Sequence, residues 1–281
     1  MPEKMPKKTP RRMNGDSAGN RNPSAATDGL RKIRRLRRDE LPRNTLELAR
    51  FLIGKTLVHD ISPATGEISR GRSTGADRGK TIRLSGRIVE TEAYPPGDAA
   101  AHSFIGETRR NRSLFLERGF SYVYFTYGCW FAMNVSSESH GTGAGVLLRG
   151  LEPLEGLEVM RTNRSASNRK SNDVSTKSQH PPTRGTLRVT DLARGPGRLA
   201  AAMEIDRSCD GLDLCGDSAL WLGSAVRPAG PIGVSIRIGI SREAHRPYRF
   251  YEIGNPHVSG PRRLSLFARE SAPMQFRTSP E

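Results

Sequence analysis

Residues 120–136 read FSYVYFTYGCWFAMNVS, an uncharged run in which β-forming side chains alternate with smaller or polar ones. Near its middle Gly128 follows Tyr127, and a glycine can supply the positive φ that a tight hairpin needs. The run is long enough to be mistaken for a membrane span, but its Ser, Thr, Tyr and Asn content favours a buried hairpin. This stretch therefore predicts two antiparallel strands that meet near 127–128.

Shorter apolar runs on both sides of this hairpin predict the rest of the fold. Asn44, with Glu47 three residues later, resembles the start of a helix that Gly54 would close. Further helices are expected at 153–160 and 197–205, and further strands at 55–60, 85–94, 145–149, 218–222, 232–240 and 248–253. The pattern predicts an α+β fold, a single domain with a curved, mainly antiparallel β-sheet, flanking helices and a protruding β-hairpin.

The net charge of +16 is concentrated in two segments. Residues 1–40 hold twelve Lys and Arg against five Asp and Glu, and residues 161–190 hold seven against one. Both segments are poor in apolar side chains, so we expect a disordered basic tail and a disordered basic loop. The loop would interrupt a domain spanning 41–260, with a flexible tail at 261–281. Basic segments can raise affinity for nucleic acid, but they identify no substrate, and 161–190 could equally be a solvated linker.

Cysteine usage and the N-terminal sequence narrow the class of protein. Three cysteines in no recognisable spacing do not support a disulfide framework, a zinc site or an iron–sulfur cluster. We expect no metal and no cofactor. The N-terminus has no apolar signal-peptide core, which argues against secretion. The run at 31–38 could be a nuclear address in a eukaryote or a nonspecific DNA anchor in a bacterium.

The predicted strand at 85–94 carries the first chemical signal. Alternate side chains of a strand point to opposite faces, so one face should hold two acids with an isoleucine and a tyrosine: Ile88, Glu90, Glu92 and Tyr94. A turn at 95–97 then precedes His102. A carboxylate, an aromatic ring and an imidazole thus fall within one short run.

Aromatic residues form a second signal, because eight of the seventeen Phe, Tyr and Trp side chains lie between Phe115 and Phe131. Most such residues are core residues, and we expect this of Phe125, Trp130 and Phe131. A tyrosine at a hairpin tip is different, since its flat ring can fill the gap that an extruded nucleotide leaves.

Ordered matches along the chain closely resemble the alkyladenine (3-methyladenine) DNA glycosylase family, also called methylpurine DNA glycosylase. They span roughly 41–260 outside the two polar loops, and occur at 87–94, 100–103, 110–112, 122–124, 127–128, 133–137, 146–156, 195–199 and 249–251. The resemblance implies a base-excision-repair enzyme that flips alkylated or deaminated purines out of damaged double-stranded DNA and hydrolyses the N-glycosidic bond.

The resemblance also implies a role for each matched residue. Glu92 would activate water, and Arg149 would help to hold it. Asn134 would reject normal guanine by crowding its amino group, and Tyr127 would intercalate in the DNA. The remaining residues would line the base pocket: Tyr94, His102, Tyr122 and Tyr124.

Elementary chemistry supports the role of Glu92 independently. Breaking an N-glycosidic bond builds positive charge on the sugar, and a nearby carboxylate can stabilise that charge and direct water. A bifunctional glycosylase would instead need an amine nucleophile, yet no lysine occurs between Lys80 and Lys170. We therefore expect a monofunctional enzyme without lyase activity. We also expect a monomer, in the cytoplasm or nucleoid of a bacterium or in the nucleus of a eukaryote.

Two other interpretations remain open from the sequence. A noncatalytic nucleic-acid-binding protein could use basic tails and a stacking hairpin, although it leaves Glu92 without a role. A helix-hairpin-helix glycosylase is suggested by the Gly-Pro-Gly at 195–197, which is a weak signal and equally fits the entry to a helix.

Overall fold

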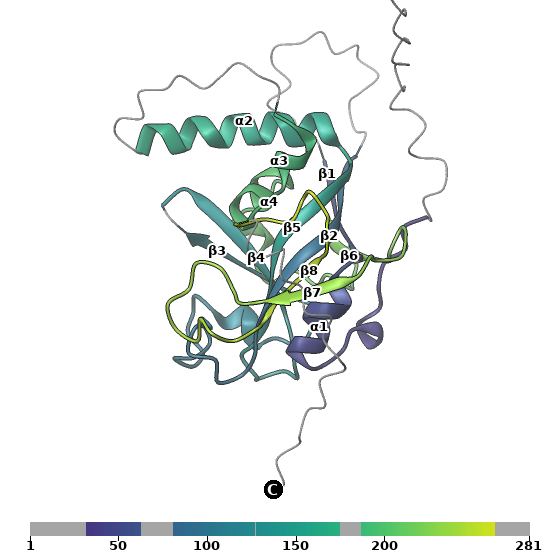
Figure 1. Cartoon of the computed structure of the whole chain (residues 1–281). Helices are drawn as coiled ribbons and strands as arrows, with labels where there is room; N and C mark the ends of the chain where they lie inside the picture. The colour runs from purple at the N-terminus through teal and green to yellow at the C-terminus, as the bar shows by residue number, and fades with distance from the viewer. Residues whose placement is uncertain (1–31, 63–80, 127, 175–186, 262–281) are drawn as a thin grey trace, which may run out of the picture. The chain divides into compact units, whose positions relative to one another are not determined.

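The computed structural model describes residues 32–62, 81–126, 128–174 and 187–261, all within one compact unit. Eight strands form one sheet, in which β3-β4-β5-β2-β1-β6 lie side by side and the β7–β8 pair joins β2 (Figure 1). Every pairing between the described strands is antiparallel. The strands are β1 (Thr56–Ile61), β2 (Ile82–Tyr94), β3 (Ser121–Thr126), β4 (Trp130–Ser136), β5 (Gly145–Glu155), β6 (Leu220–Gly223), β7 (Ile232–Ser235) and β8 (Arg249–Glu252).

Helices are fewer than strands in the described part of the chain. The α-helices are α1 (Thr45–Leu52), α2 (Leu157–Val174), α3 (Val189–Leu192) and α4 (Pro196–Ala202), and the 3₁₀ turns are η2 (Arg38–Glu40), η3 (Arg112–Phe115) and η4 (Arg207–Cys209). The predicted α+β fold with a mainly antiparallel sheet is confirmed. The alternative of a helix-hairpin-helix glycosylase, which would have an all-helical body, is wrong. No described helix has the length and apolar character needed to span a membrane.

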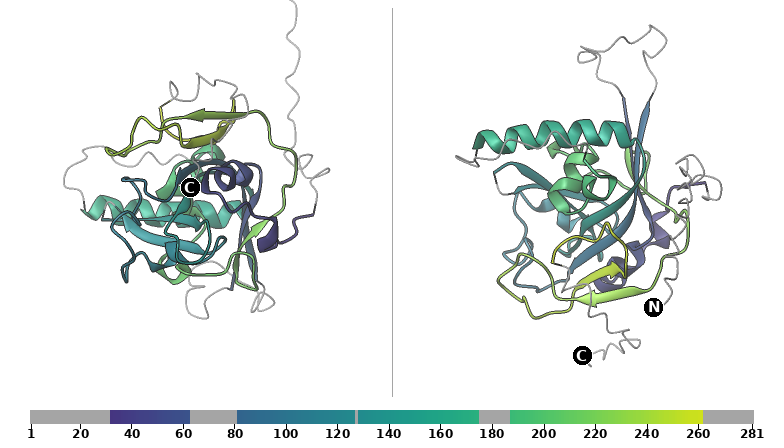
Figure 2. Two further views of the ribbon diagram at one scale, coloured as in Figure 1. Left: turned by 90° about the horizontal axis from the view of Figure 1, so that it is seen from below. Right: turned by 45° about the horizontal axis from the view of Figure 1, so that its top comes forward.

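Strand β2 organises the sheet because it changes partner along one edge. Its first half pairs with β1, from Ile82 opposite Ile61 to Arg87 opposite Thr56. Its second half pairs with β8 over Glu90–Glu92, while β5 follows the other edge (Figures 1 and 2). The register against β5 shifts between Ile88 and Thr91, which marks a β-bulge where the partner changes.

Because of the bulge, the side chains that share a face of β2 differ from those predicted. Ile88 packs in the main core together with Ala93, five residues further on, whereas strict alternation would place them on opposite faces. Val89 packs instead against Tyr251 in a small separate cluster. The extra residue thus separates Ile88 from Glu90 and Glu92, so the expected mixture of isoleucine and acids on one face is wrong.

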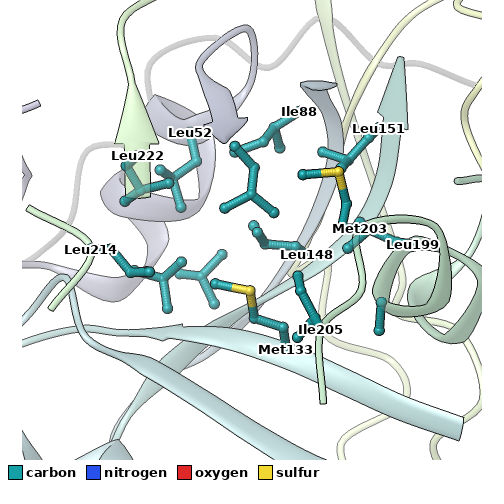
Figure 3. Close-up of a cluster of buried hydrophobic side chains, with 14 of the residues drawn as sticks. Leu52, Ile88, Met133, Leu148, Leu151, Leu199, Met203, Ile205, Leu214 and Leu222 are labelled. Carbon is teal, nitrogen blue, oxygen red and sulfur yellow. The ribbon is translucent and has the colours of Figure 1, made fainter. Parts of the chain in front are cut away.

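The main core fills the space between the sheet and helices α1 and α4. Leu148 of β5 lies near its centre, with Ile88 and Leu52 on one side and Met203 on another (Figure 3). Helix α1 begins as predicted, since the Asn44 side chain accepts hydrogen bonds from the Leu46 and Glu47 amides. Gly54 follows with φ of +86°, as the end of this helix requires.

The region after β5 differs from the prediction. Residues 153–155 continue β5, paired with β2 at Pro153 and Glu155, so the helix expected at 153–160 starts only at Leu157. That helix, α2, extends to Val174 and includes residues predicted as a disordered loop. Several hydroxyl side chains in it donate hydrogen bonds to carbonyls of the preceding turn. These polar groups therefore find partners within the helix. Residues 175–186 of the predicted loop lie outside the described residues.

The N-terminal prediction also needs a correction, because the chain is folded before residue 41. Leu36 is 2% exposed within the main core, and Arg35 forms a bridge with Gly223. The neighbouring arginines are paired: Arg34 with Glu40, and Arg38 with Asp213. One apolar anchor and paired charges thus order a segment whose composition predicts disorder. The rest of the predicted tails, 1–31 and 262–281, lies outside the described residues.

Candidate active site

A cavity of about 200 Å³ lies at the junction of β2, β3, β4 and β5. The loops at 100–103 and 238–240 complete its walls. Its polar lining comes largely from side chains that the sequence singled out: Tyr94, His102, Tyr124, Asn134 and Arg149. Side chains from five separate stretches of sequence thus converge on one small space.

Glu92 lies directly behind this cavity on β2 and has no exposed surface. Its Oε2 accepts hydrogen bonds from the Tyr94 hydroxyl at 3.0 Å and from Arg149 Nη1 at 3.2 Å. Its Oε1 accepts one from the Ile238 amide at 2.7 Å. The three residues that hold the carboxylate all line the cavity, so Glu92 lies immediately behind its wall.

The surroundings of Glu92 act on the pKa of its carboxyl group in both directions. Burial is the largest influence and raises the pKa of this carboxyl above its usual value. Arg149 and the Ile238 amide oppose the effect, and the nearby Glu90 charge adds to it. A carboxylate with a raised pKa is a stronger base once it is ionised.

Glu90, two residues before, supplies the counter-charge that fixes Arg149. It is fully buried, and its Oε1 accepts from Arg149 Nε at 3.1 Å and from Arg249 Nε at 2.7 Å. The Ser259 amide donates to its other oxygen at 2.6 Å. Burial pushes the pKa of Glu90 up, but the two guanidinium groups and the hydrogen bonds hold it below its usual value. The negative charges of two glutamates and the positive charges of two arginines therefore offset one another beside the cavity.

Aromatic rings form the opposite wall. The His102 ring lies 4.5 Å from the Tyr124 ring at an interplanar angle of 71°, and Tyr124 stacks on Tyr122 at 5.3 Å and 22°. His102 Nδ1 hydrogen-bonds to the Tyr122 hydroxyl at 2.9 Å. Tyr122 does not border the cavity; it supports His102 from behind and lines a neighbouring groove. Burial, followed by the charge of Arg110, lowers the pKa of His102, so the imidazole is neutral at pH 7.

Asn134 gives the cavity a free hydrogen-bond acceptor. It lies on β4 opposite Leu147 of β5, and it is 7% exposed. Its buried Oδ1 has no hydrogen-bond partner among the described residues. Such an atom costs free energy unless a ligand satisfies it, which is typical of a binding site.

The hairpin of β3 and β4 has the predicted form, with Thr126 opposite Trp130 and with Gly128 at φ of +69°. Tyr127, the residue expected to intercalate, lies outside the described residues. The prediction that Phe125 is a core residue is wrong, since 52% of its surface is exposed. Phe125 meets Phe131 edge to face at 5.2 Å, and both rings line a groove beside His102 and Tyr122.

A buried arginine that the sequence did not reveal joins two walls of the cavity. Arg237 donates to both carboxylate oxygens of Asp98 and to the Ala93 carbonyl. Its guanidinium carbon also lies 4.5 Å from the centre of the Tyr94 ring. The contact fixes the loop that carries the Ile238 amide against the end of β2. The strand expected at 232–240 therefore stops at Ser235, and the following residues form this loop.

Comparisons with known proteins agree with the geometry. The sequence pattern of the methylpurine-DNA glycosylase (MPG) family matches residues 75–256. A protein of Mesorhizobium japonicum named "Putative 3-methyladenine DNA glycosylase" is 51% identical over 81% of this chain and 91% of its own length. The human "DNA-3-methyladenine glycosylase" is 41% identical over 75% of this chain and 63% of its own length.

The Arg237–Asp98 pair can be tested by unfolding in urea. Arg237→Met leaves a buried carboxylate without its cation, so we expect a loss of about 3–5 kcal/mol in the free energy of unfolding. Adding Asp98→Asn should recover part of that loss. Arg188→Met removes an exposed ion pair with Asp191 and should cost less than about 1 kcal/mol. A similar small cost for Arg237→Met would show that the pair does not hold the walls together.

Proposed function

This chain belongs to the methylpurine-DNA glycosylase family, and from that premise we propose how its cavity releases a damaged purine from DNA. The protein is a DNA glycosylase of base-excision repair, and the noncatalytic alternative is not favoured. In our proposal the damaged nucleotide leaves the helix, its base enters the cavity, and Glu92 directs water onto the sugar. The buried carboxylate, hydrogen-bonded on both oxygens against the cavity wall, is the observation that carries the proposal.

The reaction is a hydrolysis at C1′ of the deoxyribose. The bond from C1′ to the base nitrogen breaks, and its electron pair leaves with the base. The oxygen of water forms the new bond to C1′ while Glu92 takes a proton from that water. The ionised carboxylate also stabilises the positive charge that develops on the sugar. Arg149, neutralised by Glu90, holds Glu92 without pulling its pKa down to that of an ordinary salt-bridged acid.

The cavity suits a single base. Its volume is below the roughly 300–1,000 Å³ typical of sites for larger ligands. One face of Tyr94 is covered by the Arg237 cation, and Tyr94, His102 and Tyr124 present aromatic surface to the cavity. Alkylated purines carry a positive ring charge that such faces attract, whereas neutral lesions would depend on stacking, shape and easy extrusion.

Discrimination against normal guanine is assigned to Asn134 in this proposal. Its side chain lines the cavity and is held on β4, so it cannot easily yield to the exocyclic amino group of guanine. Tyr127 is proposed to fill the gap in the helix, since the hairpin that carries it borders the cavity through Thr126 and Ala132. We also propose that the protein acts as a monomer, because one chain supplies every group named here, and that it works where genomic DNA lies.

Replacing Glu92 tests the central assignment. Glu92→Gln keeps the shape but removes the charge, so single-turnover release of a methylated base should fall by about 10²–10⁴-fold. Binding to a duplex with an abasic-site analogue should persist. Glu158→Gln, at a position where the side chain is 88% exposed on α2, should behave like the wild type. Unchanged base release by Glu92→Gln would remove Glu92 from the mechanism.

The pH dependence tests the same residue by another route. Because burial raises the pKa of Glu92, base release should decline on acidification at a pH above the ordinary 4.5 of a glutamate. Tyr94→Phe removes a hydrogen bond that lowers this pKa, so the decline should move to still higher pH. A single-turnover pH series for both proteins measures this shift. An acid limb that is identical in the two would contradict the assignment.

Monofunctional hydrolysis is the last part of the proposal. The residues that line the cavity in the described chain include no lysine, so no primary amine there can form a Schiff base with the sugar. Duplexes with single defined lesions should yield free base and alkali-labile sites, with no strand cleavage before alkali. Borohydride should not trap the protein on DNA, and a trapped adduct would instead indicate an amine nucleophile.

A further inference from the structure

The buried cation of Arg237 lies against the ring of Tyr94. Its guanidinium carbon is 4.5 Å from the centre of that ring and 5.4 Å from the centre of the Tyr248 ring. The Arg237 side chain has no exposed surface and does not line the cavity, whereas Tyr94 does. The Tyr94 ring therefore separates a fixed positive charge from a base that occupies the cavity.

Asp98 balances the charge of Arg237 but does not hide it from the ring. A guanidinium directs its N–H donors in its own plane, so the carboxylate that accepts from Nη1 and Nη2 lies at its edge, while the ring meets its face. The positive charge is thus the nearer of the two to Tyr94. It reaches the phenol, because burial is the largest influence and raises the pKa of Tyr94, and the charge of Arg237 acts against this rise.

A base that stacks on the Tyr94 ring lies within range of this charge. Stacked atoms are about 3.5–4.0 Å apart, so the base would be roughly 8 Å from the guanidinium carbon. Protein atoms and not bulk solvent fill that distance, so the interaction is weakly screened. A ring with a cation behind it attracts a cationic base less than the same ring without one.

The charge of the base also changes as the glycosidic bond breaks. The electron pair of the bond leaves with the base, so a cationic alkylated purine becomes neutral and a neutral deaminated purine becomes negative. A fixed cation behind the stacking ring repels the first base until its charge is gone, and it attracts the negative charge that develops on the second. Relative to free enzyme and DNA, both effects favour neutral lesions over cationic ones.

We propose that Arg237 is a specificity-determining residue, which shifts the preference of the cavity towards neutral purine lesions by placing a positive charge behind Tyr94. The inference rests on the proposed function, which brings a damaged base into the cavity. Arg237 touches no substrate in this arrangement and acts through the Tyr94 ring. The positive charge that develops on the sugar is common to all lesions and does not affect the preference.

A comparison of one cationic and one neutral lesion tests the inference. Duplexes with a single 7-methylguanine or a single hypoxanthine give kcat/KM for each lesion from single-turnover base release at subsaturating enzyme. The double variant Arg237→Gln with Asp98→Asn replaces the charged pair by two neutral amides. We expect the ratio of kcat/KM, cationic over neutral, to rise about three- to thirty-fold, which corresponds to the strength of one cation–π interaction.

Two single variants separate the charge from structural support. Arg237→Lys keeps a cation behind the ring and should keep the wild-type ratio. Asp98→Asn alone leaves the cation without its counter-charge, so the ratio should fall below that of the wild type. A change that merely loosens the cavity would slow the release of both bases alike and leave the ratio unchanged.

Arg83→Gln is the matched control, because Arg83 also lies over an aromatic ring and pairs with an aspartate. Its guanidinium carbon is 5.5 Å from the centre of the Trp221 ring, and its Nε donates to Asp60 at 2.7 Å, but these residues do not line the cavity. Arg83→Gln should keep the wild-type ratio.

An unchanged ratio in the double variant, or an equal rise in Arg237→Lys or in Arg83→Gln, would overturn the inference. If the double variant does not fold, Asp98→Asn decides the question, because it keeps the shape of the side chain and an oxygen acceptor for Arg237. An unchanged or higher ratio in Asp98→Asn would then overturn it.

The wild type separates this inference from the proposed function. If it releases both bases and the ratio does not respond to the charge at position 237, only the assignment of Arg237 is wrong. If it releases neither base, the proposed function is wrong as well.

Discussion

A carboxylate without exposed surface survives in a folded protein only where hydrogen bonds and opposite charge replace its water. Glu92 meets this condition through one tyrosine hydroxyl, one arginine and one backbone amide, which come from three separate elements. The rest of the local structure follows from that requirement. Glu90 neutralises Arg149, the bulge in β2 sends both acids to the cavity side, and β8 replaces β1 as the partner of β2 where they lie. Because Glu90 offsets the charge of Arg149, the Glu92 carboxyl keeps a raised pKa and is still stabilised by hydrogen bonds in the protein interior.

Sequence patterns predicted several of the residues that meet at the cavity, but not the contacts that hold them there. Alternation along a strand predicted that Glu90, Glu92 and Tyr94 share a face, and the resemblance added Arg149 from a strand 57 residues beyond Glu92. The bulge that separates Ile88 from these acids has no signal in one sequence, because it depends on which strands pair along β2. The pairing of Asp98 with Arg237 is equally invisible, since the two residues are 139 positions apart and meet only through the folded sheet.

Composition was a poorer guide than packing in the polar segments. A basic stretch before residue 41 and a Ser- and Asn-rich stretch after residue 160 both read as disordered, yet Leu36 lies in the core and α2 extends to Val174. In each case a few buried contacts offset an unfavourable composition. Phe125 shows the opposite error, because an aromatic residue in a hairpin need not face the core. Residues of β3 become more exposed toward the tip of the hairpin, and alternation along the strand does not reveal where the core ends.

The bond from position 238 to Glu92 uses the main chain and not a side chain. The side chain of Ile238 can therefore be replaced without loss of the amide donor. Among the twenty amino acids, only proline lacks the backbone N–H and would abolish this hydrogen bond. Neighbouring Gly239 and Ile240 border the same cavity from the same loop. The side chains that this loop presents to the cavity can therefore change while the main-chain hydrogen bond to Glu92 stays in place.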